Sequence, residues 1–213
     1  MTSPSYSLYE KLFPFNTVMK QRMVENFSGD ALDTDRWTTS QYNTTYMTFR
    51  TSDTINGGFE MVTPASNNTG GNITFGNVAR QYSETGSVFI CVAKGSDSLT
   101  ENFQGFVKDH VTWNTYRNMA TIGNVPNEGV LFSHTSNASA DTQVSCGATF
   151  HATEALYKIE CKQTLVEYGT NGTIGATVTS TLPVVPMQPR FGVRSLSAAI
   201  HTGRCTYLEC YNT

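Results

Sequence analysis

The sequence predicts an all-β fold: a sandwich of two antiparallel sheets, preceded by a short N-terminal helix or arm. Hydrophobic and polar residues alternate along much of the chain, as is typical of half-buried strands. Thr, Asn, Ser and Gly are abundant, whereas amphipathic helical patterns are scarce. Because 213 residues suit one sandwich, we expect an arm at 1–24 and a single domain at 25–213.

The arm combines a helix start with an apolar face. Ser7 and Glu10 have the spacing of a capping box, and Pro14 ends the helix that they would begin. The apolar side chains have no obvious partner in the sandwich, so we expect them to bind a neighbouring subunit. These partner-binding residues are Leu8, Leu12, Phe13, Val18, Met19 and Met23. The alternative is that the arm folds over its own domain.

The sandwich is expected to begin with a turn at 30–37, in which Asp33 caps the backbone and Trp37 enters the core. Strands follow wherever alternation is bounded by turn residues such as those at Ser66–Gly71. About six strands per sheet result. The expected strands are 41–49, 59–63, 73–81, 87–93, 103–108, 112–122, 129–134, 144–151, 156–162, 164–168, 173–180, 190–196 and 204–211.

The clearest strand pattern is a hairpin near the end of the sequence. Tyr157, Ile159 and Cys161 alternate with charged residues, which sends the two sets to opposite faces of a strand. Asn171-Gly172 then supplies two residues that tolerate positive φ, as a tight hairpin requires. Apolar residues return at every second position over 174–178. The pattern therefore predicts two antiparallel strands joined by a short turn.

This hairpin, with its Leu182-Pro183 link, resembles the closing hairpin of the concanavalin A-like lectin/glucanase superfamily. Near the start, Phe27-Ser-Gly-Asp-Ala-Leu-Asp33 followed by Trp37 is similar to the F-x-G-x-x-L-D-x-x-x-W opening of laminarinase-like members. The resemblance covers residues 25–213 and implies a concanavalin A-like jelly-roll sandwich. It leaves function open, because the superfamily includes lectins, glucanases and viral surface proteins.

The resemblance also implies where a glucanase would carry its catalytic acids. Retaining glycosidases need two carboxyl groups about 5–5.5 Å apart, and glucanases of this superfamily place them on one strand as E-x-D-x-x-E. That pattern is absent from the sequence. The candidate segment 103–122 offers one acid, Asp109, beside His110, and the four histidines show no ligand spacing. We therefore predict that the protein is not an enzyme.

A glycan site is the next hypothesis, since lectin sites combine an aromatic ring with polar donors. Trp113 and Tyr116 point to opposite faces of one expected strand, so only one ring can lie on the outer surface. The candidate glycan-binding residues are Trp113, Asn114, Tyr116 and Arg117.

An acidic turn is the candidate metal site. Asp30, Asp33 and Asp35 cluster within a few residues, and Ca²⁺ prefers clustered oxygens. Laminarinase-like relatives often hold calcium near this strand. Three aspartates are nevertheless common in solvated capping turns, so we expect no cofactor, with calcium as the alternative.

The composition excludes two further classes of protein, those that bind nucleic acid and those that span a membrane. The net charge of −3 provides no basic footprint for nucleic acid, and the longest apolar run, 88–93, is too short to cross a membrane. No signal peptide is visible, and the odd number of cysteines then favours buried, reduced thiols. Cys205 and Cys210 are five residues apart on one expected strand, so we expect them on opposite faces.

These observations lead to a predicted non-enzymatic virion structural protein, a capsid decoration or surface appendage protein that acts through protein–protein contacts. The chain resembles small, non-catalytic superfamily members found in phages and other viruses of microbes. Its expected partners are capsid or other virion proteins and copies of itself, with a host-surface glycan as a second ligand. The expected location is the virion surface, after synthesis in the host cytoplasm. A carbohydrate-binding lectin is the alternative, and a divergent glycoside hydrolase is the third.

Overall fold

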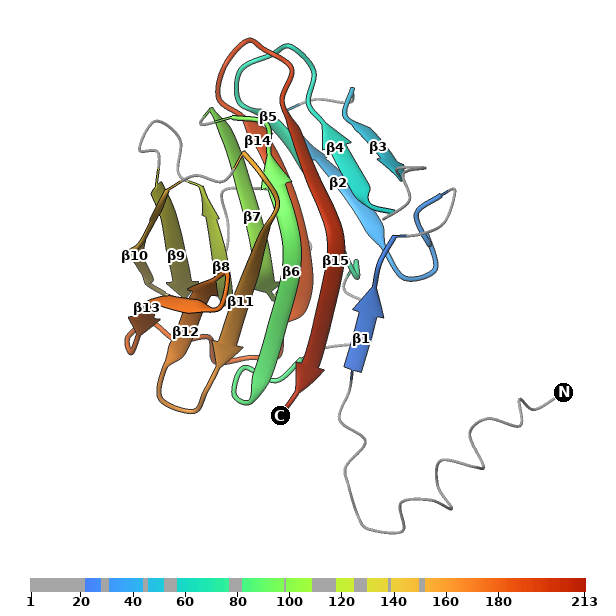
Figure 1. Ribbon diagram of the computed structural model, residues 1–213. Helices are drawn as coiled ribbons and strands as arrows, with labels where there is room; N and C mark the ends of the chain where they lie inside the picture. Colours follow the sequence, from blue (N-terminus) through green and yellow to red (C-terminus); the bar gives the residue numbers. More distant parts are fainter. Residues whose placement is uncertain are drawn as a thin grey trace, which may run out of the picture.

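Backbone hydrogen bonds join the strands of this chain into two antiparallel sheets, which stack face to face with apolar side chains between them (Figure 1). The structure is a computed structural model that describes residues 22–27, 31–43, 46–51, 57–76, 82–97, 99–108, 118–124, 130–137, 139–149 and 152–213. These residues form fifteen strands and no helix. The predicted all-β jelly-roll sandwich is therefore confirmed. The predicted helix and most of the arm lie outside the described residues.

The eight-stranded sheet contains the longest of the described strands, β15 (Thr202–Asn212), near its centre. Strand β1 (Arg22–Glu25) pairs with one end of β15, and β4 pairs with the other end. Apart from β1, the strands of this sheet follow the order β13 (Thr173–Val178), β12 (Val166–Thr170), β11 (Ala155–Cys161), β6 (Ser87–Gly95), β15 (Thr202–Asn212), β4 (Phe59–Val62) and β3 (Thr48–Thr51).

The seven-stranded sheet has β14 and β7 at its centre, paired over eight residues from Gln188 to Ser195. Its order is β10 (Asp141–Thr149), β9 (Val130–Ser136), β8 (Met119–Asn124), β7 (Thr100–Val107), β14 (Gln188–Ser195), β5 (Thr69–Thr74) and β2 (Thr38–Tyr42). Every pair in both sheets is antiparallel.

The core lies between the two sheets and follows the predicted alternation. Tyr157, Ile159 and Cys161 are buried in it, while the residues between them face outward. Trp37 is also buried, and its backbone N–H donates to the carbonyl oxygen of Asp33 at 2.8 Å. The Asp33 carboxylate accepts from the N–H of Asp35 at 3.1 Å. The capped turn that leads Trp37 into the core is therefore confirmed.

Several predicted boundaries are wrong, and two of these corrections lie near the start of the domain. The expected strand 41–49 is two strands, β2 and β3, which belong to different sheets. The expected loop at Ser66–Gly71 already contains the start of β5 at Thr69. Glycines are accommodated inside that strand because neighbouring atoms leave no room for a side chain. A Cβ on Gly71 would lie 2.9 Å from the ring of Phe49.

A bulge in β15 overturns the predicted orientation of two cysteines. The register against β6 shifts between Cys205 and Tyr207, so Cys205 lies opposite Ala93 and Cys210 lies opposite Phe89. Ala93 and Phe89 share a face, and both cysteines consequently point into the core. All five cysteines are free and buried.

The sandwich extends into the segment predicted as the arm. Strand β1 begins at Arg22, and the side chain of Met23 is buried in the core with 4% of its surface exposed. At the end of the strand, the Glu25 carboxylate accepts from the guanidinium of Arg36 at 3.0 Å and from the indole N–H of Trp37 at 3.3 Å. Met23 is therefore part of the domain core and does not offer its side chain to a partner.

Candidate functional site

The outer face of the seven-stranded sheet carries a set of buried polar side chains. Phe191 and Val193 of β14 point into the core, so Arg190 and Arg194 point outward. The register then places Thr74 of β5, Thr121 of β8 and His134 of β9 in the same cross-strand row as Arg190. We call this surface the polar face; its residues are Asn72, Thr74, Glu101, Thr121, His134, Arg190 and Arg194.

An ion pair lies at the centre of the polar face. Arg194 and Glu101 are directly opposite each other on β14 and β7, and Arg194 Nε lies 2.5 Å from Glu101 Oε2. Only 17% of the Arg194 side chain and 9% of the Glu101 side chain are exposed. A charge pair so far removed from water interacts more strongly than a surface pair, because the local dielectric constant is lower.

Two side-chain oxygens of this face are buried without a partner among the described residues. Asn72 Oδ1 and Thr121 Oγ1 accept or donate no hydrogen bond among the residues that the structure describes. Both side chains are almost fully buried. Because an unsatisfied buried polar group costs about 1–3 kcal/mol, such atoms indicate a place where a polar ligand or water would be stabilised.

Aromatic rings lie beside these polar groups. Phe103 of β7 and Phe132 of β9 are partly exposed and flank Gly123 of β8 in one cross-strand row. A Cβ on Gly123 would lie 2.9 Å from Phe103 Cδ1, so the Phe103 ring extends across the glycine. Rings next to polar donors are typical of surfaces that bind sugars.

His134 marks the side of the polar face nearest the β10 edge. Its Nε2 lies 3.7 Å from Asp141 Oδ2 of β10. Burial lowers the pKa of His134, and the nearby Asp141 carboxylate raises it by a smaller amount. The imidazole is therefore neutral at neutral pH and can accept as well as donate a hydrogen bond.

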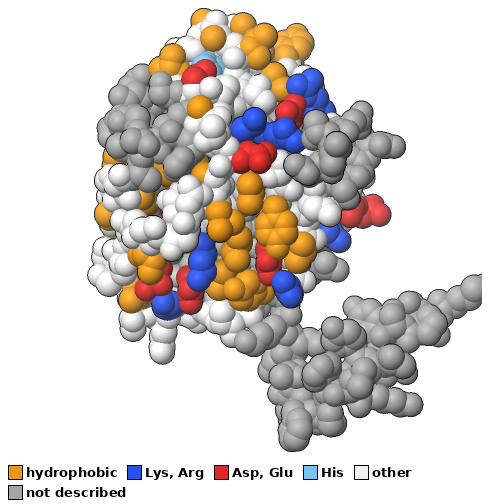
Figure 2. Space-filling view, in the orientation of Figure 1, with side chains coloured by type: hydrophobic (Ala, Val, Ile, Leu, Met, Phe, Trp, Pro, Cys, Tyr) orange, Lys and Arg blue, Asp and Glu red, His pale blue; other side chains and the backbone are white. Residues whose placement is uncertain are grey.

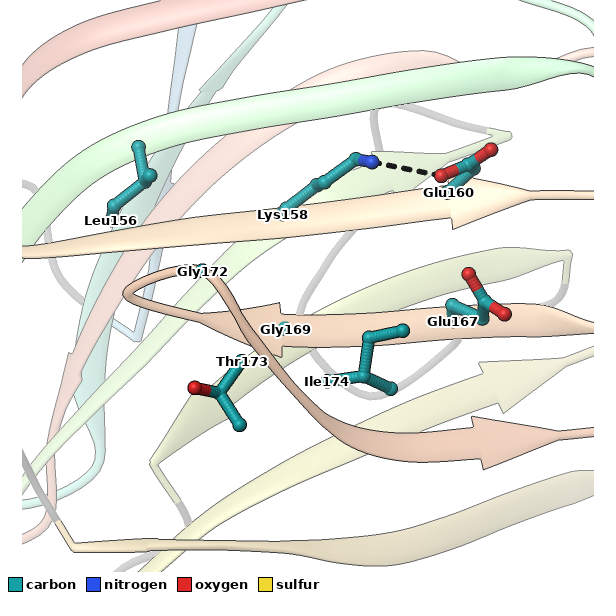
Figure 3. A pocket seen from close by; sticks show the side chains of 8 residues that line it. All are labelled: Leu156, Lys158, Glu160, Glu167, Gly169, Gly172, Thr173 and Ile174. Carbon is teal, nitrogen blue, oxygen red and sulfur yellow. Dashed lines mark hydrogen bonds and ion pairs between the residues drawn. The ribbon is translucent and has the colours of Figure 1, made fainter.

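The opposite sheet carries a shallow pocket of about 240 Å³ with two carboxylates (Figure 3). Glu160 of β11 and Glu167 of β12 are cross-strand neighbours on its outer surface. Lys158 contacts Glu160 at 2.8 Å, and Lys162 contacts Glu167 at 2.7 Å. Glu160 therefore faces outward between two lysines, and Figure 2 shows acidic and basic side chains adjacent on the lower part of this face.

Glu160 is poorly suited to be the proton donor that glycoside hydrolysis needs. The hydrogen bond from Lys158 lowers the pKa of Glu160, more strongly than burial raises it, and the charges of Lys158 and Lys162 lower it further. A general acid requires a raised pKa. We therefore place the candidate site on the polar face.

Several predicted site residues lie outside the described residues, namely Trp113, Asn114, Tyr116, Arg117, Leu8, Leu12, Phe13, Val18, Met19 and Asp30. The structure does describe Asp33 and Asp35, whose contacts within the capping turn are given above. In the described part of the chain, no three His, Cys, Asp or Glu side chains form a group that could hold a metal ion. Nor does that part contain a helix long and apolar enough to cross a membrane.

Sequence reasoning did not identify the polar face. The signal was present, because Arg190 and Arg194 alternate with Phe191 and Val193 and must point away from the core. Glu101 could not be paired with Arg194 before the register of β7 against β14 was known.

Solved structures with the same fold include glycanases and glucanases. An endo-acting O-glycanase with which members of the human gut microbiota initiate mucin breakdown has a TM-score of 0.67 and 11% identity, over 90% of this chain and 98% of the other. A laminarinase from Flavobacterium sp. UMI-01 has a TM-score of 0.66 and 12% identity, over 89% and 99%. A Bacillus licheniformis β-glucanase has a TM-score of 0.64 and 12% identity, over 90% and 98%. No protein-family model and no curated protein sequence matches the chain.

These matches confirm the laminarinase-like, concanavalin A-like jelly roll, and at identities of 11–12% they establish the fold alone. They contradict the prediction that the protein is not an enzyme, because the structures that share its fold over almost their whole length are enzymes. The resemblance to non-catalytic viral proteins is not supported. The predicted virion partners, location and lack of a cofactor stay predictions.

Proposed function

We propose that the protein is a carbohydrate-active enzyme that cleaves or transfers glycosidic bonds of a polysaccharide lying along the polar face. The fold shared with glucanases and an O-glycanase supports this class of activity. The observation that carries the proposal is the buried Arg194–Glu101 pair, because Glu101 is the carboxylate that the described central strands place on this face.

Glycoside hydrolysis uses two carboxyl groups, one charged and one protonated. In this proposal Glu101 is the charged group, which attacks the anomeric carbon or activates water, and Arg194 orients it. The candidates for the second group are Asp109 and Glu128, in the connections between β7 and β8 and between β8 and β9. Both acids lie outside the described residues.

The remaining polar-face side chains would bind the sugar. Arg190, Asn72 and Thr121 supply hydrogen-bonding groups for hydroxyls, and the two unsatisfied oxygens would gain partners when a glycan binds. Phe103 and Phe132 would stack on the apolar face of a sugar ring.

The test is to incubate the full chain with β-1,3-glucan, mixed-linkage β-glucan and mucin, together with a fluorescent acceptor oligosaccharide. Mass spectrometry of the products separates hydrolysis from transfer. We expect the product rate to fall by about 100-fold or more in Glu101→Gln and in one of Asp109→Asn and Glu128→Gln. Glu160→Gln, on the opposite sheet, is the matched control and should keep full activity. A folded protein that yields no product from these glycans, or whose Glu101→Gln variant remains fully active, would contradict the proposal.

A further inference from the structure

Three connections meet at one end of the sandwich, around His201. They are the end of β4 at Thr63, the β6–β7 turn at Ser96–Leu99 and the β14–β15 connection at Leu196–His201 (Figure 1). The backbone N–H of Thr63 donates to the carbonyl oxygen of His201 at 2.9 Å, and the N–H of His201 donates to Thr63 Oγ1 at 3.0 Å. These bonds fix the backbone on both sides of the histidine.

The imidazole of His201 connects a serine to an aspartate. Its Nε2 lies 2.6 Å from Ser197 Oγ, and its Nδ1 lies 2.9 Å from Asp97 Oδ2. The ring is 2% exposed, whereas Ser197 is partly exposed and 46% of the Asp97 side chain is accessible. The histidine is therefore enclosed, and the serine at one end of the chain of hydrogen bonds reaches solvent.

The aspartate determines which nitrogen of the ring carries the proton. A carboxylate accepts only, so Nδ1 must donate to Asp97, and the neutral ring then has a free lone pair on Nε2. Ser197 consequently donates its hydroxyl proton toward Nε2, as a serine nucleophile does toward its base.

The surroundings hold Asp97 in its charged form. Burial, the largest influence, raises the pKa of Asp97, but it is outweighed by the N–H of Leu99, by the charge that His201 carries when it is protonated, and by hydrogen bonds from Thr100 and His201, so the pKa is lowered. The Leu99 N–H donates to Asp97 Oδ1 at 2.8 Å, and the Thr100 hydroxyl donates to the same oxygen at 3.1 Å. These bonds orient Oδ1, while Oδ2 lies 2.9 Å from Nδ1 of His201 and also accepts from Ser96 Oγ at 3.4 Å.

Backbone donors lie directly after the serine. The N–H groups of Ala198 and Ala199 make no hydrogen bond to any described residue. Both residues are exposed, as is Ile200, with 64% of its surface accessible. The N–H of the residue after a serine nucleophile is a common oxyanion donor, and small neighbouring side chains leave room for a substrate carbonyl.

We propose that Ser197, His201 and Asp97 form a second catalytic site, which hydrolyses carboxylic esters. Ser197 Oγ attacks the ester carbonyl carbon while its proton passes to His201 Nε2, and the carbonyl oxygen becomes an oxyanion near the Ala198 and Ala199 N–H groups. The C–O bond to the alcohol then breaks, and His201 returns the proton to the leaving oxygen. Water, deprotonated by His201, cleaves the acyl-serine ester and releases the carboxylic acid. Because the serine is accessible at the surface, the substrate is an exposed ester, such as an acyl group on a larger chain.

The first experiment uses the unmodified protein. A fluorophosphonate probe is added to the folded chain, followed by trypsin digestion and mass spectrometry. We expect the label on the peptide between Arg194 and Arg204, with fragment ions that place it on Ser197 and not on Ser195. Absence of label from this peptide, or label on Ser195 alone, would overturn the proposal.

The second experiment measures hydrolysis of p-nitrophenyl acetate. Ser197→Ala and Asp97→Asn should each lower kcat/KM by about 100-fold or more. The control is Ser66→Ala, which changes an exposed turn serine whose hydroxyl contacts no described residue. Circular dichroism checks that each variant is folded. Equal rates for wild type, Ser197→Ala and Ser66→Ala would show that Ser197, His201 and Asp97 have only a structural role, in which they hold the β6–β7 and β14–β15 connections together. The glycan variants of the polar face should leave this rate unchanged, so the two proposed activities can fail independently.

Discussion

Gly105 shows how strongly one residue can be constrained in this sandwich. It lies within β7 at a φ of +145°, a conformation that residues with a side chain rarely adopt. A Cβ there would lie 2.6 Å from Ile159 Cδ1 and 2.8 Å from the Cα of Thr121. Backbone conformation and packing therefore both require glycine at this position.

We predict that Gly105→Ala lowers the free energy of unfolding by about 2–5 kcal/mol, from strain and overpacking together. Gly172→Ala is the control, because its φ is also positive at +83° but a Cβ would contact nothing within 4 Å. Strain alone should cost the control about 1–2 kcal/mol. Urea denaturation measures both values, and equal losses in the two variants would argue against the packing explanation.

The cysteines lead to a second prediction at this scale. All five thiols are buried, and burial raises the pKa of Cys146 to about 11 and that of Cys161 to about 12. Because the thiolate is the reactive form, we expect none of the five to react with Ellman's reagent at pH 8 in the folded protein and all five to react in denaturant. Rapid reaction of even one thiol without denaturant would be inconsistent with this packing.

At the scale of elements, β1 is the strand whose role differs most from expectation. Its register pairs Met23 with Cys210 and Glu25 with Leu208, and the Glu25 carboxylate holds Arg36 and Trp37. The segment predicted as a tether thus contributes a strand, a core side chain and a polar anchor to the domain.

Two truncations that differ only in β1 test this contribution. We predict that a chain of residues 26–213 is less stable than one of residues 22–213 by about 2–5 kcal/mol, as for loss of a buried methionine. Met23→Ala in the longer chain should reproduce much of the loss. Equal midpoints of urea unfolding for the two truncated chains would mean that β1 adds no stability.

The elements also show what a sequence can and cannot predict. Strands β11 and β13 were predictable because their apolar residues alternate and turn residues bound them, and β6 was predictable as a short continuous apolar run. The bulge at Thr206 was not, since an extra residue in a strand has no local signature and becomes visible only through the register against β6. The polar face and the Ser197–His201–Asp97 site could not be predicted for the same reason, because each depends on contacts between distant parts of the sequence. Glu101 contacts Arg194 and Asp97 contacts His201, and in each pair the two residues are 90 or more positions apart in the sequence.

At the scale of the whole molecule, the buried thiols of cysteine and hydroxyls of tyrosine make the folded state less stable at alkaline pH. Burial raises the pKa of Cys91, Cys146, Cys161 and Cys210, and also that of Tyr157 and Tyr168. In the unfolded chain a thiol ionises at about pH 8.5–9. The folded state therefore binds more protons than the unfolded state above that pH, and stability falls as pH rises.

We predict a melting temperature that is independent of these groups below about pH 8.5 and falls steadily from about pH 9 to 11. Each thiol that ionises only on unfolding contributes about 1.4 kcal/mol per pH unit in that interval. Differential scanning calorimetry across the interval measures the slope. The Cys161→Ser variant should show a shallower slope than wild type, and an unchanged slope would exclude Cys161 as a contributor.

The position of β15 has a consequence for how the protein is made. This last described strand separates β6 from β4 and also holds β1, so it joins the two halves of the eight-stranded sheet (Figure 1). While a ribosome is still adding the residues before Thr202, that sheet has a gap in its middle and its flanking strands have unpaired edges. The eight-stranded sheet can therefore be completed only after synthesis has passed Asn212, and until then its unpaired edges are open to association with other chains.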